Sequence, residues 1–341
     1  MAHHEDRLAG LVPNGFAIVM ATGIVSIAAR LLGHDTVGWA LLALNAVQYP
    51  LLWVALMVRV ARAPGRVAAE LGSHERGPGF LTMVAASAVL GSQLDGFSLA
   101  PGLTVWLFGV AVVLWVVLIY SFLAAVTLRE AKPEVHAGLS GSWLLVVVAT
   151  ESLAVLGVRV AVGSAWPGPL IFACLAAFLL GGVLYALLMA LILYRFVFMP
   201  MPSDALSGPW WINMGAVAIA TLAGAGLTAL PTFDEHVAVL RHVAGPLTAV
   251  FWATATFWIP LLIVLYGWKH AVRREPIRYE MGQWSIVFPL GMYTAATMMF
   301  GRNAELAFLE PIAQWFFWVA LLAWLLTAAG AVRQMWRKFR P

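Results

Sequence analysis

The chain alternates between long apolar stretches and short polar links. An α-helix needs roughly 20 apolar residues to cross the hydrocarbon core of a bilayer, and each stretch is close to that length. The pattern therefore predicts an all-α polytopic membrane protein with ten transmembrane helices. The predicted spans cover residues 13–32, 37–60, 79–95, 101–128, 140–162, 166–198, 208–229, 240–268, 283–301 and 308–333.

The predicted spans fall into pairs when they are numbered along the chain. Odd-numbered spans are short, and most even-numbered spans are longer. The links inside a pair are short, such as residues 94–97 and 163–167, whereas most links between pairs are longer and richer in charge. This rhythm predicts five helical hairpins in tandem, an internal repeat of about 65 residues.

The odd-numbered spans also differ from the even-numbered spans in chemistry. They carry small and hydroxyl side chains, which either line a wet path or let neighbouring helices approach closely. The even-numbered spans carry bulkier side chains, so we expect the odd spans inside and the even spans against lipid. The candidate path residues are Thr22, Gly23, Ser87, Thr150, Glu151, Thr221 and Thr294.

Composition excludes a soluble protein. Hydrophobic residues make up 62% of the chain and charged residues 11%, whereas a soluble domain carries about 25% charged residues. We expect residues 1–341 to form a single transmembrane domain. The net charge of +4 is small and argues against a nucleic-acid partner. The one cysteine and the scattered histidines show no metal-ligand spacing, so we expect no metal or other cofactor.

Basic residues predict the orientation. Of the 20 Lys and Arg residues, 16 lie at the N-terminus, after even-numbered spans or in the C-terminal tail. The positive-inside rule then places both termini on the cytoplasmic side of the membrane. We expect that membrane to be the inner or plasma membrane of the cell. The short N-terminus is residues 1–12, and the basic tail is residues 334–341. The four basic residues on the opposite side are Arg30, Arg159, Arg241 and Arg302.

The ninth span contains a candidate gate. Pro289 removes a backbone donor near the middle of the span and is expected to bend the helix, and Phe288 stands directly before it. An unpaired backbone carbonyl is costly in lipid, so a bent helix is better placed against protein or a water-filled path. We predict that Phe288 obstructs such a path. The alternative is a kinked packing helix with a core phenylalanine.

Two short motifs resemble the tellurite-resistance/dicarboxylate transporter family. They are Met20-Ala21-Thr22-Gly23-Ile24 in the first span and Phe288-Pro289 in the ninth of ten spans. The resemblance implies a pseudo-five-fold fold in which the odd helices form an inner ring around one pore per subunit. It also implies a homotrimer and a pore plugged by Phe288.

Glu151 is an acidic residue near the middle of the fifth span, without a basic residue one turn away on its helix. An isolated ionised carboxylate is expensive there, so we expect it to be neutral, paired across helices or hydrated. A proton-coupled carrier is one interpretation, and a structural hydrogen bond to another helix is the other. Arg159 and Arg302 either draw anions toward an outer vestibule or anchor helix ends by snorkelling.

Transport is the function class that these features favour. The resemblance implies that the substrates are small anions or C4-dicarboxylates such as malate and succinate, moving through a central pore in the lipid bilayer. The alternatives are a polytopic membrane enzyme and a receptor-like sensor. An enzyme needs converging titratable groups, and one glutamate does not supply them. Channel and proton-coupled carrier both remain open.

Overall fold

The computed structural model describes residues 14–230 and 235–339 as helices joined by turns, and these residues include no β-strand. Ten helices coincide with the ten predicted spans, and two short ones, α4 and α7, lie in the links between hairpins. The helices are α2 (Ala17–Leu31), α3 (Asp35–Arg62), α4 (Pro64–Leu71), α5 (Thr82–Gly96), α6 (Pro101–Leu128), α7 (Val135–Gly138), α8 (Leu145–Val162), α9 (Pro167–Phe198), α10 (Ile212–Ala229), α11 (Glu235–Gly267), α12 (Trp284–Asn303) and α13 (Glu310–Phe339).

Eight of the described helices are long and apolar enough to cross a membrane. The other two long helices, α5 and α12, are not among these eight. Helix α5 has only 15 residues and contains Gln93 and Asp95, while α12 contains Pro289 and ends beside Arg302. The chain is therefore an all-α, multi-pass membrane protein. Its crossing ten times stays a prediction.

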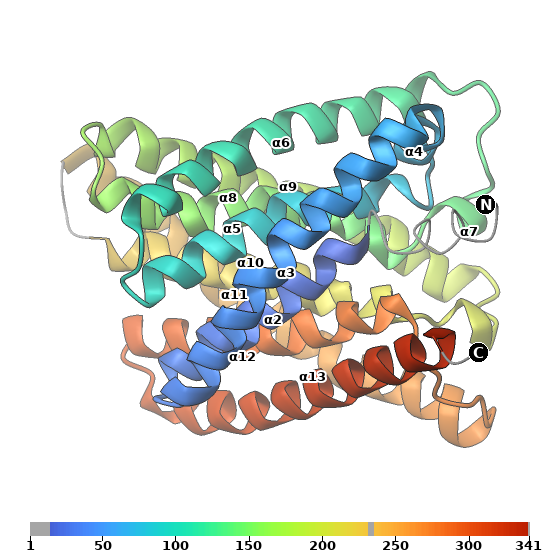
Figure 1. The fold of residues 1–341 in the computed structure, drawn as a ribbon. Coiled ribbons are helices and arrows are strands. Elements are labelled where there is room, and N and C mark those ends of the chain that lie inside the picture. The colour runs from blue at the N-terminus through green and yellow to red at the C-terminus, as the bar shows by residue number, and fades with distance from the viewer. Residues whose placement is uncertain (1–13, 231–234, 340–341) are drawn as a thin grey trace.

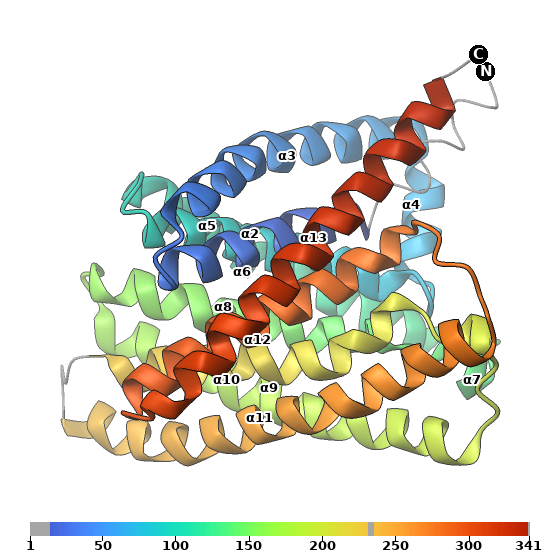
Figure 2. The same ribbon diagram turned by 90° about the horizontal axis from the view of Figure 1, so that it is seen from below.

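Burial separates the membrane-length helices into two groups. The apolar windows that contain α2, α8 and α10 are 78%, 72% and 83% buried inside the protein. The windows in α3, α6, α9, α11 and α13 are only 22–33% buried. Helices α5 and α12 also bury most of their residues. The five helices from odd-numbered spans thus lie inside, and the five longer helices lie outside (Figures 1 and 2).

The five inner helices touch one another in a closed cycle. Helix α2 packs against α5, α5 against α8, α8 against α10, α10 against α12, and α12 against α2. Each inner helix also packs against the outer helix that follows it in the chain. In Figure 2, α3 lies along one edge of the bundle and α11 along the opposite edge. The hairpins therefore surround a common centre formed by inner helices.

A repeated set of hydrogen bonds links each outer helix to the inner helix of the next hairpin. We call this set the aromatic girdle. In every case an aromatic side chain of the outer helix bonds to a hydroxyl or carbonyl oxygen of the inner helix, at 2.8–3.1 Å. The five pairs are Tyr49–Ser87, Trp115–Thr150, Tyr185–Asn213 carbonyl, Trp252–Thr297 and Trp324–Thr22. The last pair closes the cycle between the two ends of the chain.

Removing one hydroxyl of the aromatic girdle should weaken the fold modestly. Thr150→Val keeps the side-chain shape but leaves the Trp115 indole N–H, which donates at 2.9 Å, without its acceptor. We expect the free energy of unfolding in mixed micelles to fall by about 1 kcal/mol. In a double-mutant cycle, Thr150→Val should cost less when Trp115 is already Phe. If Thr150→Val lowers the free energy of unfolding equally with Trp115 and with Phe at position 115, the hydrogen bond does not contribute to stability.

Glycine lets the starts of the inner helices approach one another. Each inner helix begins with a short 3₁₀ turn, and the turns before α8, α10 and α12 lie side by side. A methyl group on Gly141 would collide with the carbonyl of Pro209, and one on Gly208 with the carbonyl of Gly282. These two positions therefore need glycine because backbone approaches backbone there.

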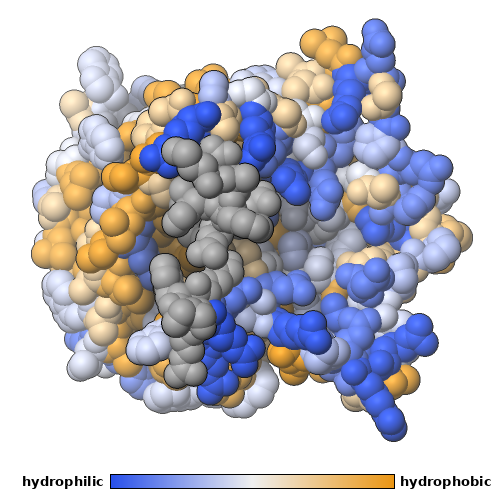
Figure 3. All heavy atoms as spheres, turned by 45° about the vertical axis from the view of Figure 1, so that its right-hand side comes forward, coloured by the Kyte–Doolittle hydropathy of each residue, from blue (hydrophilic) through white to orange (hydrophobic). Residues whose placement is uncertain are grey.

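The beginning of α2 and the end of α13 lie at the same end of the molecule (Figure 1). In Figure 3, hydrophilic residues gather over the right half of the view and hydrophobic residues over the left. Most large exposed apolar side chains, such as Val113, Leu187 and Leu326, belong to outer helices, as a lipid-facing surface requires. The predicted N-terminal segment 1–12 lies outside the described residues. Residues 334–339 of the predicted tail continue α13, and 340–341 lie outside.

Candidate functional site

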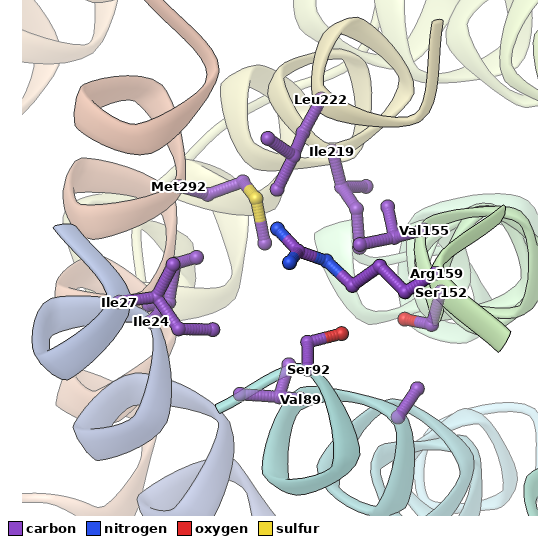
Figure 4. Close-up of a pocket in the computed structure, with 11 residues that line it drawn as sticks. Ile24, Ile27, Val89, Ser92, Ser152, Val155, Arg159, Ile219, Leu222 and Met292 are labelled. Atoms are coloured by element: carbon purple, nitrogen blue, oxygen red, sulfur yellow. The ribbon is translucent and has the colours of Figure 1, made fainter. Parts of the chain in front are cut away.

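A narrow cavity lies between the five inner helices. Every inner helix contributes to its wall, and the empty space among the lining atoms is about 320 Å³, including space open to solvent (Figure 4). Most of the wall is aliphatic. The lining residues are Ile24, Ile27, Ala88, Val89, Ser92, Ser152, Val155, Arg159, Ile219, Leu222 and Met292.

Phe288 lies on the face of α12 that points toward this cavity. It precedes the cavity residue Met292 by four positions, and residues four apart share one face of a helix. The other faces of α12 are occupied. A methyl group at Gly291 would lie 2.9 Å from Ile24 of α2, and Tyr293 bonds to Thr256 of α11. Phe288 is 2% exposed, so its side chain is packed inside the protein, one helical turn before Met292.

Pro289 does not break α12, which continues as an α-helix from Trp284 to Asn303. Its ring instead packs against α10, where a methyl group at Gly215 would lie 2.7 Å from Pro289 Cγ. The ninth span is therefore one continuous helix, and the bend expected at Pro289 stays a prediction. Because Gly215 has no side chain, α10 and α12 approach closely beside Phe288.

The predicted path residues are all buried, but the cavity wall is made by other residues of the same helices. The hydroxyls of Thr22, Ser87 and Thr150 take part in the aromatic girdle and so point toward outer helices. Gly23 lies against Val89 and against Asn45 of α3.

Two further path candidates bond within their own helices. The hydroxyl of Thr221 donates to the carbonyl of Val217, and that of Thr294 donates to the carbonyl of Leu290. Each hydroxyl proton is therefore already used in a hydrogen bond, and it is not free to be donated to a solute. The assignment of all these residues to a substrate path stays a prediction.

Glu151 lies between α8 and α9. It is fully buried beside Gly181, and neither carboxyl oxygen has a hydrogen-bond partner among the described residues. Only a glycine leaves room for the carboxyl group here, since a methyl group on Gly181 would overlap it. The expected hydrogen bond to a neighbouring helix is thus not seen, and the side chain faces an outer helix.

A pair of opposite charges marks one end of the cavity. Arg159, in the last turn of α8, bonds through Nη1 to Oδ2 of Asp95 at 2.7 Å. The turns after α5 and α8 lie at the end of the molecule opposite the end of α13 (Figure 1). The sequence shows why α8 presents Arg159 here, since Ser152, Val155 and Arg159 share one helical face. The ion pair with Asp95, which is 64 residues away in the chain, could not be predicted from any pattern in the sequence.

The described residues hold no group of three or more His, Cys, Asp or Glu side chains that is arranged to bind a metal ion. The polar residues of the cavity wall are Ser92, Ser152 and Arg159, and no acidic side chain is among its described lining residues. The described residues thus form a mostly apolar cavity with one cationic side chain, Arg159, in its wall.

Comparisons with known proteins extend these observations. The family model described as "Voltage-dependent anion channel" matches residues 10–332. An uncharacterized membrane protein of Mycobacterium tuberculosis is 39% identical over 152 residues, which cover 45% of this chain and 77% of that protein. An uncharacterized transporter of Methanocaldococcus jannaschii is 22% identical over 334 residues, 94% of this chain and 92% of that protein. A second transporter of that organism is 25% identical over 159 residues, 46% of this chain and 44% of that protein.

Proposed function

Because the chain belongs to the voltage-dependent anion channel family, we propose that it carries small anions or C4-dicarboxylates through the cavity at the centre of the inner helices. The observation that carries this proposal is the closed cycle of five inner helices around a cavity to which each contributes. In this proposal all ten long helices cross the membrane, α5 and α12 included, because outer helices shield them from lipid.

The same proposal includes a pseudo-five-fold architecture. Its support is the aromatic girdle, in which five outer helices make equivalent bonds to five inner helices. We further propose that both termini face the cytoplasm of the inner or plasma membrane and that three copies associate, each with its own pore. The excess of basic residues at the end where α2 begins supports the orientation.

Phe288 is the proposed gate of this path. Helical spacing puts Phe288 on the same face of α12 as the cavity residue Met292. In this proposal its ring fills the path one turn toward the start of α12, and the aliphatic wall excludes water while the ring is in place. Hydrophobic constrictions of this kind stop ions by dewetting. Rotation of Phe288 would join the cavity to the space on the side of the termini.

Selection among anions should be weak in such a path. The wall offers few polar groups, so an ion that enters loses part of its hydration without full replacement. Ions that hold water weakly should then pass most easily. The test is flux into proteoliposomes with chloride, nitrate, malate and succinate offered separately, with and without a proton gradient. Absence of flux for all four anions, also in a Phe288→Ala variant, would reject the proposed function.

Glu151 is the proposed proton-binding group if the protein works as a coupled carrier. The observation in its favour is that a buried carboxyl group without a partner is costly, and proteins rarely keep such a group without a use for it. In this mechanism Glu151 binds a proton when substrate enters and releases it on the other side. The proton would act from the interface of α8 with α9 by changing how these helices pack.

Replacing Glu151 should test coupling directly. Gln has the shape of the protonated acid but does not titrate, so Glu151→Gln should abolish the pH dependence of dicarboxylate uptake and the uptake driven by a proton gradient. Downhill anion flux should persist at a rate within about twofold of wild type. Glu130→Gln makes the same change at an exposed acid in the link between α6 and α7, so this control should keep the wild-type pH dependence. An unchanged pH profile in Glu151→Gln would reject the coupling role and leave a channel.

A further inference from the structure

Arg159 is the single charged residue among the described residues that line the central cavity. Its guanidinium group extends into the space between Met292, Ile219 and Ser92 (Figure 4). One of its nitrogens donates to Asp95, and that is the one hydrogen bond that the described residues give this side chain. A guanidinium carries five N–H donors. Most of the donors of Arg159 therefore remain available to a solute in the cavity.

Arg159 also lines a second, wider hollow outside the central cavity. This hollow contains about 1060 Å³ of empty space, open solvent included, and is formed by the turns that follow α5 and α8. Asp95, Ser98 and Gly163 are among its lining residues. Arg159 is the one residue that lines both spaces, so its guanidinium group lies where the outer hollow and the cavity adjoin.

Ser92 supplies an independent sign of a binding site. Its side chain is 3% exposed, lines the central cavity and has a hydroxyl oxygen without a hydrogen-bond partner among the described residues. In Figure 4 this hydroxyl group and the Arg159 guanidinium group both face the central cavity. A buried hydroxyl group without a partner is rare in proteins and calls for an explanation such as a bound water or ion.

We propose that Arg159 and Ser92 form an anion-binding site at the outer mouth of the path, and that Asp95 is a built-in competitor that the entering anion displaces. The site takes a small monovalent anion or one carboxylate group. This inference rests on the proposed anion transport through the cavity. It goes further because it assigns the step of anion capture, and the selection of anions over cations, to named residues.

The ion pair has the exposure that such an exchange requires. The side chains of Arg159 and Asp95 are 27% and 38% exposed, so water reaches both of them. Ion pairs with this much access to water are weak, because solvent screens the charges. An incoming anion can therefore replace the Asp95 carboxylate on Arg159 and then accept a hydrogen bond from Ser92. Without an anion, Asp95 neutralises the mouth.

Other arginines at this end of the protein are arranged differently. Arg30 pairs with Asp35, and both are well exposed. Arg302 donates to the backbone carbonyl of Leu31 at 2.9 Å. Neither Arg30 nor Arg302 lines the central cavity or the outer hollow. They provide matched controls, because they carry the same charge at the same end of the bundle.

The experiment measures anion flux and the anion-to-cation permeability ratio in proteoliposomes that contain the full chain, with chloride and nitrate as probes. Arg159→Gln should raise the half-saturating chloride concentration about tenfold and lower the permeability ratio, since a tenfold change corresponds to one lost charge-assisted hydrogen bond. Asp95→Asn should change both quantities in the opposite direction. Ser92→Ala should raise the half-saturating concentration several-fold and leave the permeability ratio unchanged.

The controls separate this site from general surface charge. Arg302→Gln and Asp35→Asn alter the same charges outside the cavity and should leave both quantities within twofold of wild type. If Arg159→Gln and Asp95→Asn behave like these controls while anion flux is present, the binding site is wrong and the transport function stands. If the shifts have the same sign in Arg159→Gln and Asp95→Asn, Asp95 supports Arg159 instead of competing with the anion, and the proposal is overturned.

Discussion

Replacing Phe288 with alanine should raise the flux of chloride and nitrate by at least about tenfold, since removing the ring needs to lower the barrier by only about 1.4 kcal/mol to do so. The physical reason is that Phe288 occupies the inner face of α12 one turn below the cavity residue Met292. Alanine removes the ring and leaves room for water beside Pro289. The measurement is anion flux in proteoliposomes at equal protein content.

A matched control distinguishes gating from loosened packing. Phe300 lies on the same helix, with its ring 6.2 Å from that of Trp252 on the outer helix α11. Phe300→Ala therefore makes the same chemical change away from the proposed path and should leave flux near the wild-type rate. Both variants should elute as single species in size-exclusion chromatography. Equal flux through Phe288→Ala and wild type would remove Phe288 as the gate.

The sequence predicted the positions of the helices well, for a local reason. A span is defined by continuous apolar residues, and each predicted span coincides with a long helix. The division into inner and outer helices was also predicted, because side chains that face lipid are bulkier than those between helices. The family was predicted from two motifs, and the match over residues 10–332 confirms it.

The directions of individual side chains could not be predicted in the same way. The inner helices are buried on all sides, so no polar stripe distinguishes the face toward the cavity from the face toward outer helices. Thr22 illustrates the problem, since its partner is Trp324, 302 positions later in the chain. From the sequence alone, a serine or threonine on an inner helix is equally compatible with facing a water-filled path and with bonding to a tryptophan of an outer helix.

Ion pairs were the other feature beyond the reach of the sequence. The distance in sequence from Asp95 to Arg159 is 64 residues, and they meet only because α5 packs against α8. Glu70 was not singled out at all, although it lies in a short helix between two hairpins and is almost completely buried. Its neighbours are two arginines, and this arrangement leads to the second large effect that we expect.

Replacing Glu70 with glutamine should lower the free energy of unfolding by about 3 kcal/mol, the lower end of the range for breaking a buried ion pair. Glu70 accepts hydrogen bonds from Arg59 at 2.5 Å and from Arg76 at 3.1 Å, and thereby holds α4 against the end of α3. The side chains of Arg59 and Glu70 are only 6% and 9% exposed. Glutamine keeps the shape but removes the negative charge that lies between the two arginines.

The measurement is denaturant unfolding in mixed micelles, with Glu134→Gln as the control. Glu134 is also paired, with His136, but its side chain is 81% exposed, so solvent already screens its charge and the control should unfold like wild type. The double variant Arg59→Met with Glu70→Leu should recover much of the lost stability, because apolar side chains often replace a buried ion pair without cost. If Glu70→Gln is no less stable than Glu134→Gln, the pair does not hold α4 in place, and packing alone fixes this corner of the bundle.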